Sequence, residues 1–276
     1  MSGFTALTER LAQKGPAGAE TLTRALNTYF GQLIDLITAY GGDVAKFAGD
    51  GLTAVWPVEN GVDNPEIKDN PVVMLPMVTL RAAACALAIQ TALQNYQADD
   101  EARLTLRIGI SAGDMALIQV GGVYGRWDFV VTGPSLYQAS EAQARAQPGQ
   151  IVVAPAAWDL IGDCATGQDL SEGYVRLETV QGGFNLTPQP APILPAELET
   201  PLRAYIPGAI LARLAAGQSG WLAELRRITI LFVNLPHLND TTPLEQSQAA
   251  MQAMQTALYR YEGSVNKISV DDKGAT

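Results

Sequence analysis

Histidine and cysteine are scarce in this chain of 276 residues. His237 is the only histidine, which excludes a histidine-ligated zinc site or a Ser-His-Asp triad in the first half of the chain. The two cysteines, Cys85 in an alanine-rich segment and Cys164 near a predicted loop, are too few for a disulfide framework. Free thiols are typical of a reducing compartment, so we expect a cytoplasmic protein.

Positive charge and long apolar runs are also limited. Lys and Arg number 18 against 28 Asp and Glu, for a net charge of −10. This balance disfavours nucleic acid or an anionic membrane surface as the main partner, because both require basic patches. We find no apolar run near the roughly 18 residues of a membrane span and no signal peptide. Hydrophobic residues make up 47% of the chain, enough for a buried core. At about 150 residues per domain, the length predicts roughly two domains.

Two segments of the sequence resemble each other. AYGGDVAKFAGDGLTAVW covers residues 39–56, and RYEGSVNKISVDDKG covers residues 260–274. Four pairs of matching residues are each separated by 221 positions: Tyr40 and Tyr261, Gly42 and Gly263, Val44 and Val265, Lys46 and Lys267. Spaced matches of this kind indicate a duplicated module.

The first of these segments predicts a β-hairpin. Gly49-Asp50-Gly51 is a tight-turn signal, because Asp-Gly favours a turn with positive φ. Strand-forming residues flank it on both sides: Val44, Phe47, Leu52, Val55 and Trp56. The carboxylate of Asp50 would then project at the edge of the sheet, where it either only forms the turn or also contacts a metal ion.

Periodicity predicts the remaining elements of the first module. Apolar residues at helical spacing favour helices over residues 19–40 and 80–96. Proline-rich residues 60–76 favour a loop. Strands are expected at residues 104–111, 115–120, 128–132 and 151–154. Helices alternating with hairpin-linked strands predict an α+β sandwich with a mixed, mainly antiparallel sheet.

A proline-rich segment divides the chain. Six prolines between Pro188 and Pro207 argue against a continuous helix or central strand, so we place the first module at residues 1–187 and a linker with its lead-in at 188–222. The second module, residues 223–276, is expected to be the N-terminal third of a repeat. A helical lead-in is predicted at 210–225, and the module itself would contain a buried strand at 228–235, a helix at 244–261 and a hairpin from Gly263 onward.

Four blocks resemble motifs of the class III nucleotidyl cyclases, the adenylyl and guanylyl cyclase family. GGDVAKFAGDGLTAVW is similar to the metal-site hairpin, MSGFTALTERL to the end of the opening motif, LRIGISAGD to a later strand, and PGQIVVAPAAWDL to the closing strand and helix. The blocks follow the family's order over roughly residues 1–160. The tandem layout and the segment WLAELRRITILFVNL most resemble the soluble, bicarbonate-responsive adenylyl cyclases.

The resemblance implies a ferredoxin-like α/β sandwich with the start of a second copy, and a metal site. Asp50 corresponds to one of two aspartates that bridge two Mg²⁺ ions, with Mn²⁺ as an alternative. The other aspartate would precede Ser2 by two residues, where this sequence has only Met1. We therefore expect a fragment, truncated at both ends and lacking its first strand, that is inactive alone.

The family pattern also implies nucleotide contacts. Gly3, Phe4 and Thr5 would begin a helix whose backbone N–H groups bind the β- and γ-phosphates, although Thr5 could equally be a simple helix cap. Arg107 corresponds to a phosphate-binding arginine, or it marks only the solvated face of a strand. Lys267 corresponds to a lysine that accepts adenine, or it is a solvated strand lysine.

Other positions depart from the family pattern. The asparagine and arginine that stabilise the transition state are replaced by Tyr137 and Glu141, and the base-selecting position is Val130. An acidic residue cannot neutralise a phosphate in the transition state, so this half resembles the first, metal-binding domain of tandem cyclases. Lys46 corresponds to a bicarbonate-binding lysine, but Ser140 replaces its arginine partner. The anion site therefore retains one of its two cations.

We therefore predict an adenylate cyclase that converts ATP to cyclic AMP and pyrophosphate at the interface of two cyclase domains paired within one chain. The alternative is a degenerate, non-catalytic module that senses a nucleotide or an anion. A diguanylate cyclase, suggested by Gly41-Gly42-Asp43, is disfavoured because Val-Ala-Lys follows in place of Glu-Phe. Nucleic acid and a membrane are not expected as partners.

Overall fold

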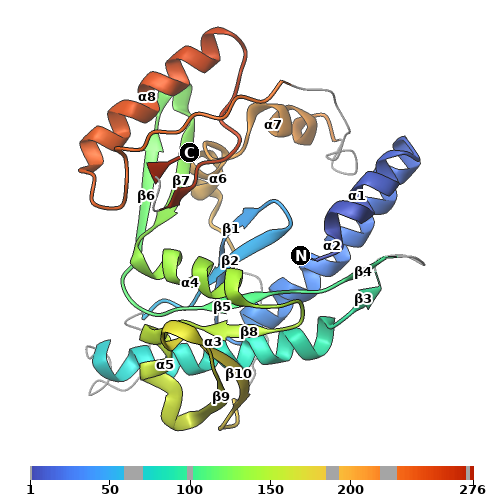
Figure 1. Cartoon of the computed structure of the whole chain (residues 1–276). Coiled ribbons are helices and arrows are strands. Elements are labelled where there is room, and N and C mark those ends of the chain that lie inside the picture. The colour runs from blue at the N-terminus through green and yellow to red at the C-terminus, as the bar shows by residue number, and fades with distance from the viewer. Residues whose placement is uncertain (1, 59–70, 98–101, 185–192, 218–228, 272–273) are drawn as a thin grey trace. The chain divides into compact units, whose positions relative to one another are not determined.

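The computed structural model describes residues 2–58, 71–97, 102–184, 193–217, 229–271 and 274–276. The chain divides into two compact units. Unit 1 contains residues 1–114 and 138–190, and unit 2 contains residues 115–137 and 191–276. The elements are labelled in Figure 1.

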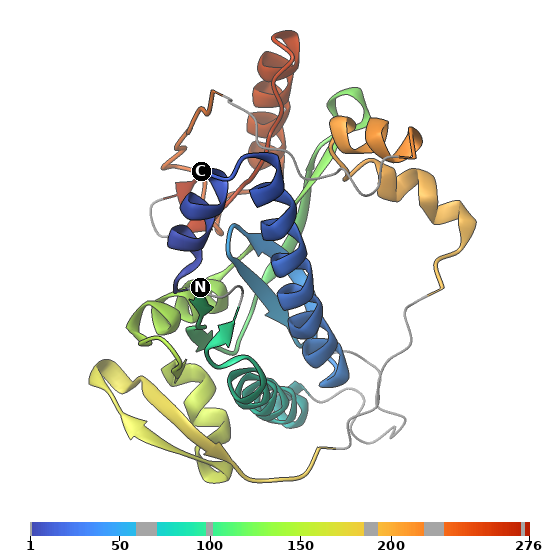
Figure 2. The same cartoon turned by 90° about the vertical axis from the view of Figure 1, so that its right-hand side faces the viewer.

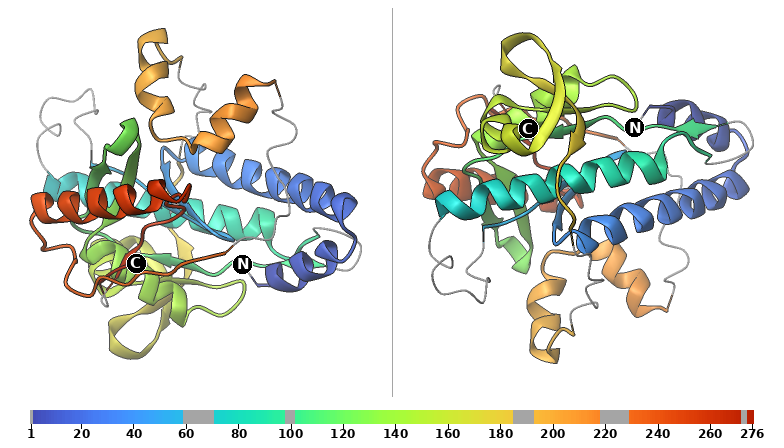
Figure 3. Two further views of the ribbon diagram at one scale, coloured as in Figure 1. Left: turned by 90° about the horizontal axis from the view of Figure 1, so that it is seen from above. Right: turned by 90° about the horizontal axis from the view of Figure 1, so that it is seen from below.

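Two long helices run through unit 1. α2 (Pro16–Ala39) begins with proline at its first position, where a missing N–H costs nothing. α2 and α3 (Pro71–Leu93) lie side by side in both views of Figure 3. The other α-helices that lie wholly or mostly in this unit are α1 (Phe4–Ala12), α4 (Pro134–Arg145) and α5 (Pro155–Ile161). Short 3-10 turns follow at Gly162–Cys164 and Ser171–Gly173.

The main sheet of unit 1 has four strands in the order β5-β8-β10-β9. β5 (Ile108–Ile110) is parallel to β8 (Ile151–Val153). β10 (Val175–Val180) pairs antiparallel with both β8 and β9 (Ala165–Asp169). Two separate antiparallel pairs complete the unit: β1 (Asp43–Ala48) with β2 (Gly51–Val55), and β3 (Tyr96–Gln97) with β4 (Arg103–Leu104). The α+β prediction with mainly antiparallel pairing is confirmed.

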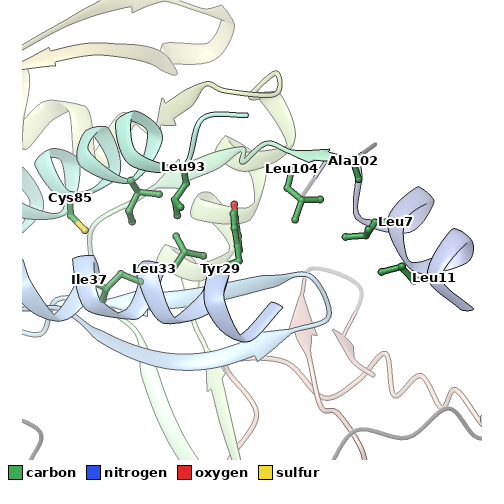
Figure 4. Close-up of a cluster of buried hydrophobic side chains, with 10 residues drawn as sticks. Leu7, Leu11, Tyr29, Leu33, Ile37, Cys85, Leu93, Ala102 and Leu104 are labelled. Carbon is green, nitrogen blue, oxygen red and sulfur yellow. The ribbon is translucent and has the colours of Figure 1, made fainter. Parts of the chain in front are cut away.

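The core of unit 1 lies where α2 and α3 meet. Figure 4 shows Leu33 and Ile37 of α2 facing Cys85 and Leu93 of α3, with Tyr29 beside them. Burial raises the pKa of the Cys85 thiol to about 12, so this cysteine is a packing residue at neutral pH. A second buried cluster joins α3, through Ala83 and Ala86, to the four-stranded sheet. α3 is therefore the central helix of the unit.

The composition of α3 corrects one expectation. Met74–Leu93 has a mean hydropathy of 1.4 and is long and apolar enough to cross a membrane by length and composition alone. The statement that no apolar run has this length was wrong, because small residues such as Ala83 and Ala86 lengthen the apolar stretch. α3 supplies residues to the two buried clusters described above, so we interpret it as a core helix. A core helix can be as long and as apolar as a membrane-spanning one.

Unit 2 is built around a long hairpin and one helix. β6 (Ala116–Gly121) pairs antiparallel with β7 (Trp127–Thr132), and a 3-10 turn at Val123–Gly125 joins them. α8 (Leu244–Arg260) lies along β6, as Figures 1 and 2 show. Val120, Val130 and Met251 form the buried cluster between them. The remaining elements are Ala196–Leu198 (3-10), α6 (Glu199–Arg203), α7 (Gly208–Ala215), β11 (Val270–Asp271) and β12 (Gly274–Ala275).

Two predicted loops contain helix. α3 begins at Pro71 and includes Pro76, so residues 71–76 are helical although a loop was predicted for residues 60–76. Residues 60–70 of that predicted loop lie outside the described residues. In the linker, Pro201 is the third residue of α6, where the first turn of a helix tolerates proline. The sequence interpretation therefore gave prolines too much weight as residues that end a helix.

The apolar run at residues 228–235 is not the predicted buried strand. Over the described residues 229–235, only Leu235 makes a β-bridge, to Ala275. Ile230, Leu231 and Phe232 are 66%, 73% and 82% exposed. Strand propensity alone does not make a strand, because the backbone N–H and C=O groups need partner strands.

The repeated segments share the way their preceding helices end. The N–H of Gly42 donates to the carbonyl of Ile37 at the end of α2, and the N–H of Gly263 donates to Leu258 at the end of α8, both at 2.9 Å. The preceding residues, Gly41 and Glu262, have positive φ angles of 73° and 59°. Both helices thus end in the same Schellman-type turn at the same offset, which supports the duplication.

After this turn the two copies differ. The first copy continues into the hairpin of β1 and β2, whereas the second reaches a strand only at β11, with two residues on each side. The predicted hairpin from Gly263 onward therefore starts later than expected.

Candidate functional site

Asp50 lies in the turn of the β1–β2 hairpin. Ala48 pairs with Gly51, so the two turn residues are Gly49 and Asp50. The positive φ falls on Gly49, at 62°, and not within Asp-Gly as the sequence motif suggested. This is a turn with glycine at the first central position, which suits the right-handed twist of the strands. The Asp50 side chain is half-buried at the tip of the hairpin.

The N-terminus of α1 offers backbone donors. Gly3 is the N-cap, with φ 90°, and no side chain caps the helix, so Thr5 does not act as the cap. The first N–H bonded within the helix is that of Leu7, to Gly3, at 3.1 Å. The N–H groups of Phe4, Thr5 and Ala6 therefore lie at the open end of the helix, where an anion is favoured.

Arg107 lies close to that helix end. Ser2 and Thr105 exchange two backbone hydrogen bonds of 2.9 and 3.2 Å, which hold the start of α1 beside the segment that carries Arg107. Arg107 is exposed and lies between β4 and β5, not within a strand, so the predicted continuous strand over residues 104–111 is interrupted here. An exposed guanidinium in this place can bind phosphate oxygens.

The hairpin with Asp50 and the segment with Arg107 border one core. Val44 and Leu52 of the hairpin pack on the same buried cluster as Phe4, Leu106 and Ile108. The structure thus places the start of α1 beside the segment that carries Arg107, and Asp50 on a hairpin that packs on the same cluster. Lys267 belongs to unit 2, and its position relative to these residues is not defined.

The described residues do not complete a metal centre. Among them, no group of three or more His, Cys, Asp or Glu side chains lies close enough to hold an ion. The carboxylate of Asp50 is a donor of the type that Mg²⁺ prefers, but one carboxylate is not a site. We therefore assign no reaction step to a metal.

Glu141 has a structural contact in place of a phosphate contact. The Tyr174 hydroxyl donates to Glu141 Oε2 at 2.5 Å. Arg145 forms an ion pair with Glu172 and lies 4.1 Å from the centroid of the Tyr174 ring. Burial, and then the hydrogen bond to Glu141, raise the pKa of Tyr174. At this position α4 therefore packs against the loop before β10.

The two other substituted positions also have structural roles. The hydroxyls of Tyr137 and Thr132 are 3.0 Å apart and share a hydrogen bond. Val130 is 2% exposed and packs in the core of unit 2 against Met251. A buried valine that contacts a helix cannot select a purine base.

The two aligned lysines differ in setting. Lys46 lies within β1, opposite Thr53, and is half-buried. Ser140, which replaces the arginine of the expected anion site, is exposed on α4. Lys267 is exposed on a segment without regular structure, so the reading as a strand lysine does not hold.

Sequence reasoning missed one cluster of polar contacts in unit 2. Three glutamines of α8, Gln248, Gln252 and Gln255, hydrogen-bond to the backbone around Gly121 at the end of β6. Their spacing of four and three residues puts them on one face of a helix. That spacing was the available signal, but glutamines on a helix usually indicate a solvated face.

Comparison with known proteins identifies the class of this fold. Residues 1–178 match the family model of the adenylate and guanylate cyclase catalytic domain, and the chain belongs to that family. The resemblance seen in the sequence motifs is confirmed.

Particular relatives extend the match beyond the first module. Adenylate cyclase type 10 of Mus musculus is 28% identical over 314 residues, and that of Homo sapiens 27% over 315 residues; each match covers 100% of this chain. The chain spans 18% of the length of these relatives.

Solved structures confirm the fold. The dimeric guanylyl cyclase domain of the RhoGC fusion protein from Blastocladiella emersonii is 16% identical with a TM-score of 0.51, and the match covers 66% of this chain and 91% of that one. The guanylate cyclase domain of RhGC from Catenaria anguillulae, in complex with GTP, is 17% identical with a TM-score of 0.50, covering 66% and 92%.

Proposed function

We propose that the protein is an adenylate cyclase that converts ATP to cyclic AMP and pyrophosphate where two cyclase modules of one chain pair. The ribose 3′-hydroxyl attacks the α-phosphorus, the bond to the β-phosphate oxygen breaks, and pyrophosphate leaves with that oxygen. The hydroxyl proton passes to solvent or to a nearby base. The observation that carries the proposal is the β1–β2 hairpin, which has Asp50 in its turn and lies within the part of the chain that matches the cyclase family.

Each candidate residue has a role that its setting supports. The Ser2–Thr105 bridge supports a shared role for Arg107 and the N–H groups of Phe4 and Thr5, which would hold the phosphate chain because both favour anions. Asp50 would ligate one of two Mg²⁺ ions, with Mn²⁺ as an alternative, and the remaining ligands are not among the described residues. Lys267 would contact adenine, and its exposure leaves its ammonium group accessible.

The choice of ATP and the cellular location rest on separate support. The relatives from Mus musculus and Homo sapiens, which match the whole chain, are named adenylate cyclases. Cys85 and Cys164 are free thiols, as expected in the cytoplasm. Bicarbonate would have to bind at Lys46 without the second cation, because Ser140 offers only a hydroxyl.

A non-catalytic sensor module is the second candidate. The observation that favours it is the structural use of Glu141 and Tyr137, which removes the transition-state contacts expected on α4. In the proposed enzyme those contacts come from the second module. The two candidates differ in whether Asp50 matters for turnover.

Substitution of Asp50 tests the proposal. Asp50→Asn preserves the turn but removes the anionic metal ligand, so cyclic AMP production by the full-length protein should fall by about 10²-fold or more at saturating Mg²⁺. Asp43→Asn, an exposed position at the start of the same hairpin, is the matched control and should retain activity. If both variants keep near-parental rates, Asp50 only forms the turn and the metal assignment fails.

A further inference from the structure

The contact between α8 and the β6–β7 hairpin is made by side-chain amides that bind backbone groups. Gln248 binds Gly121 at two points: its Oε1 accepts from the Gly121 N–H at 2.8 Å and its Nε2 donates to the Gly121 carbonyl at 2.7 Å. Nε2 of Gln252 donates to the same carbonyl at 3.2 Å. These bonds saturate the backbone of one residue at the end of β6.

Gln255 binds the other side of the hairpin end. Its side chain is fully buried, accepts from the Val123 N–H at 3.2 Å, and donates to the Arg126 carbonyl at 3.2 Å and to Asp128 Oδ2 at 3.1 Å. All of its hydrogen-bonding positions but one are therefore used, as a buried amide requires. An apolar residue of similar size would leave these groups unsatisfied.

The hairpin is shaped to receive these amides. Gly121 has φ 116°, and a Cβ atom there would lie 2.6 Å from Gln255 Nε2. Only glycine avoids that clash and adopts that φ without strain. The glutamine face of α8, defined as Gln248, Gln252 and Gln255, and the glycine at the end of β6 therefore fit each other specifically.

The duplicated helix α2 lacks this face. With the two helix ends aligned at Gly42 and Gly263, the positions that match the glutamine face are Asn27, Gly31 and Ile34. Asn27 is exposed, and among the described residues nothing lies within 4 Å of a Cβ built at Gly31, so these two positions of α2 are open in unit 1. On this face α2 has one short amide side chain, whereas α8 has three long ones.

We propose that the glutamine face of α8 is the specificity determinant of module pairing. It selects the β6–β7 hairpin of the same chain as the partner of α8, and its absence from α2 prevents that hairpin from binding the α2 helix of a second copy. Unpaired buried backbone groups in the wrong complex provide the discrimination. This inference rests on the proposed pairing of two cyclase modules, but amide exchange and oligomeric state test it without an activity measurement.

Hydrogen exchange on the chain tests the contact. In the double variant Gln248→Asn with Gln255→Ile, which gives α8 two of the three matching residues of α2, the amides of Gly121 and Val123 should exchange about tenfold faster or more. The amide of Ile118, in the β6–β7 ladder, should keep its protection. Gln246→Ile, at an exposed position of the same helix, is the control. If the amides of Gly121 and Val123 exchange as slowly in the double variant as in the parental protein, the proposal is overturned.

A second variant separates amide chemistry from packing. Gln255→Glu keeps the shape but loses both donated bonds and places a carboxylate beside Asp128. The other charged or titratable groups facing this position are Arg126, whose guanidinium donates to the Arg203 carbonyl, and Tyr259. Repulsion between the two carboxylates and the unpaired Arg126 carbonyl should open this contact, so the protection of the Val123 amide should fall at pH 7. Unchanged protection at pH 7 would show that packing alone holds the hairpin.

Transferring the long amide side chains from α8 to α2 tests whether their absence from α2 excludes a second copy of the chain. Adding Asn27→Gln and Ile34→Gln to the double variant gives α2 the long amides that α8 has lost. Sedimentation velocity should then show a concentration-dependent dimer, whereas the double variant alone stays monomeric. A monomer at all concentrations for the transferred variant would contradict the claim that α2 is excluded by its missing amides.

Discussion

At the scale of single residues, two positions of α4 that would act on phosphate are used for packing. Glu141 accepts a hydrogen bond from Tyr174, and Tyr137 shares one with Thr132. A carboxylate cannot replace a guanidinium beside a phosphate, because the sign of its charge is wrong. In the proposed enzyme, the first module would therefore act through Asp50 and Arg107 and not through α4.

In the proposed enzyme, we predict that one residue, Lys267, decides base selection. Lys267→Glu in the full-length protein should reduce the use of ATP more than that of GTP, because a site that hydrogen-bonds one purine edge leaves polar groups unpaired with the other. The measurement is the ratio of kcat/KM for ATP to that for GTP. Ser264→Glu, an exposed position on the same segment, is the control and should leave the ratio unchanged. A lower rate with a constant ratio would show that Lys267 does not contact the base.

At the scale of elements, α2 carries a buried polar atom in the core of unit 1. The side chain of Tyr29 is 0% exposed, and its hydroxyl has no hydrogen-bond partner among the described residues. Its ring packs edge-on against Tyr96, with centroids 5.0 Å apart. A buried hydroxyl without a partner costs roughly 1–3 kcal/mol.

Tyr29→Phe should therefore increase the free energy of unfolding by about 1 kcal/mol. Burial raises the pKa of Tyr29 above its ordinary value of 10.0, so the parental protein should also lose stability as the pH rises beyond that value, and the variant should lose less. Urea denaturation at pH 7 and pH 11 measures both effects, with Tyr96→Phe as the control. A loss of 1 kcal/mol or more at pH 7 would mean that the hydroxyl has a partner.

Elements with local signals were predictable from the sequence. The β1–β2 hairpin follows from its turn residues, and α2 and α8 follow from apolar spacing, each to within a few residues. The segment at 229–235 was wrong because its composition fits a strand but pairing depends on distant residues. β9 and β10 were missed, because Ala165–Asp169 has few strand-forming residues and is held by its register with β10.

The candidate site was predictable only in part. The resemblance located Asp50, Arg107 and the start of α1, and the structure adds the Ser2–Thr105 bridge that joins the last two. The contacts of Gln255 could not be anticipated, because a buried glutamine looks like a solvated one until the hairpin that covers it is known. Side chains that bind a distant backbone leave no local pattern in the sequence.

At the scale of the whole molecule, the compact units do not follow the sequence order. Unit 2 combines residues 115–137 of the first cyclase module with residues 191–276, so the β6–β7 hairpin shares its core with α8. The division into modules at residues 1–187, 188–222 and 223–276 stays a prediction. A hairpin of one module held by a helix of the next provides a physical means for pairing within one chain.

The central claim is that this pairing makes an adenylate cyclase. The most direct measurement is the product analysis of the purified full-length protein incubated with ATP and Mg²⁺. We predict cyclic AMP and pyrophosphate in equal molar amounts, with GTP converted more slowly. Binding of ATP without formation of either product would contradict the account and identify the protein as a non-catalytic nucleotide sensor.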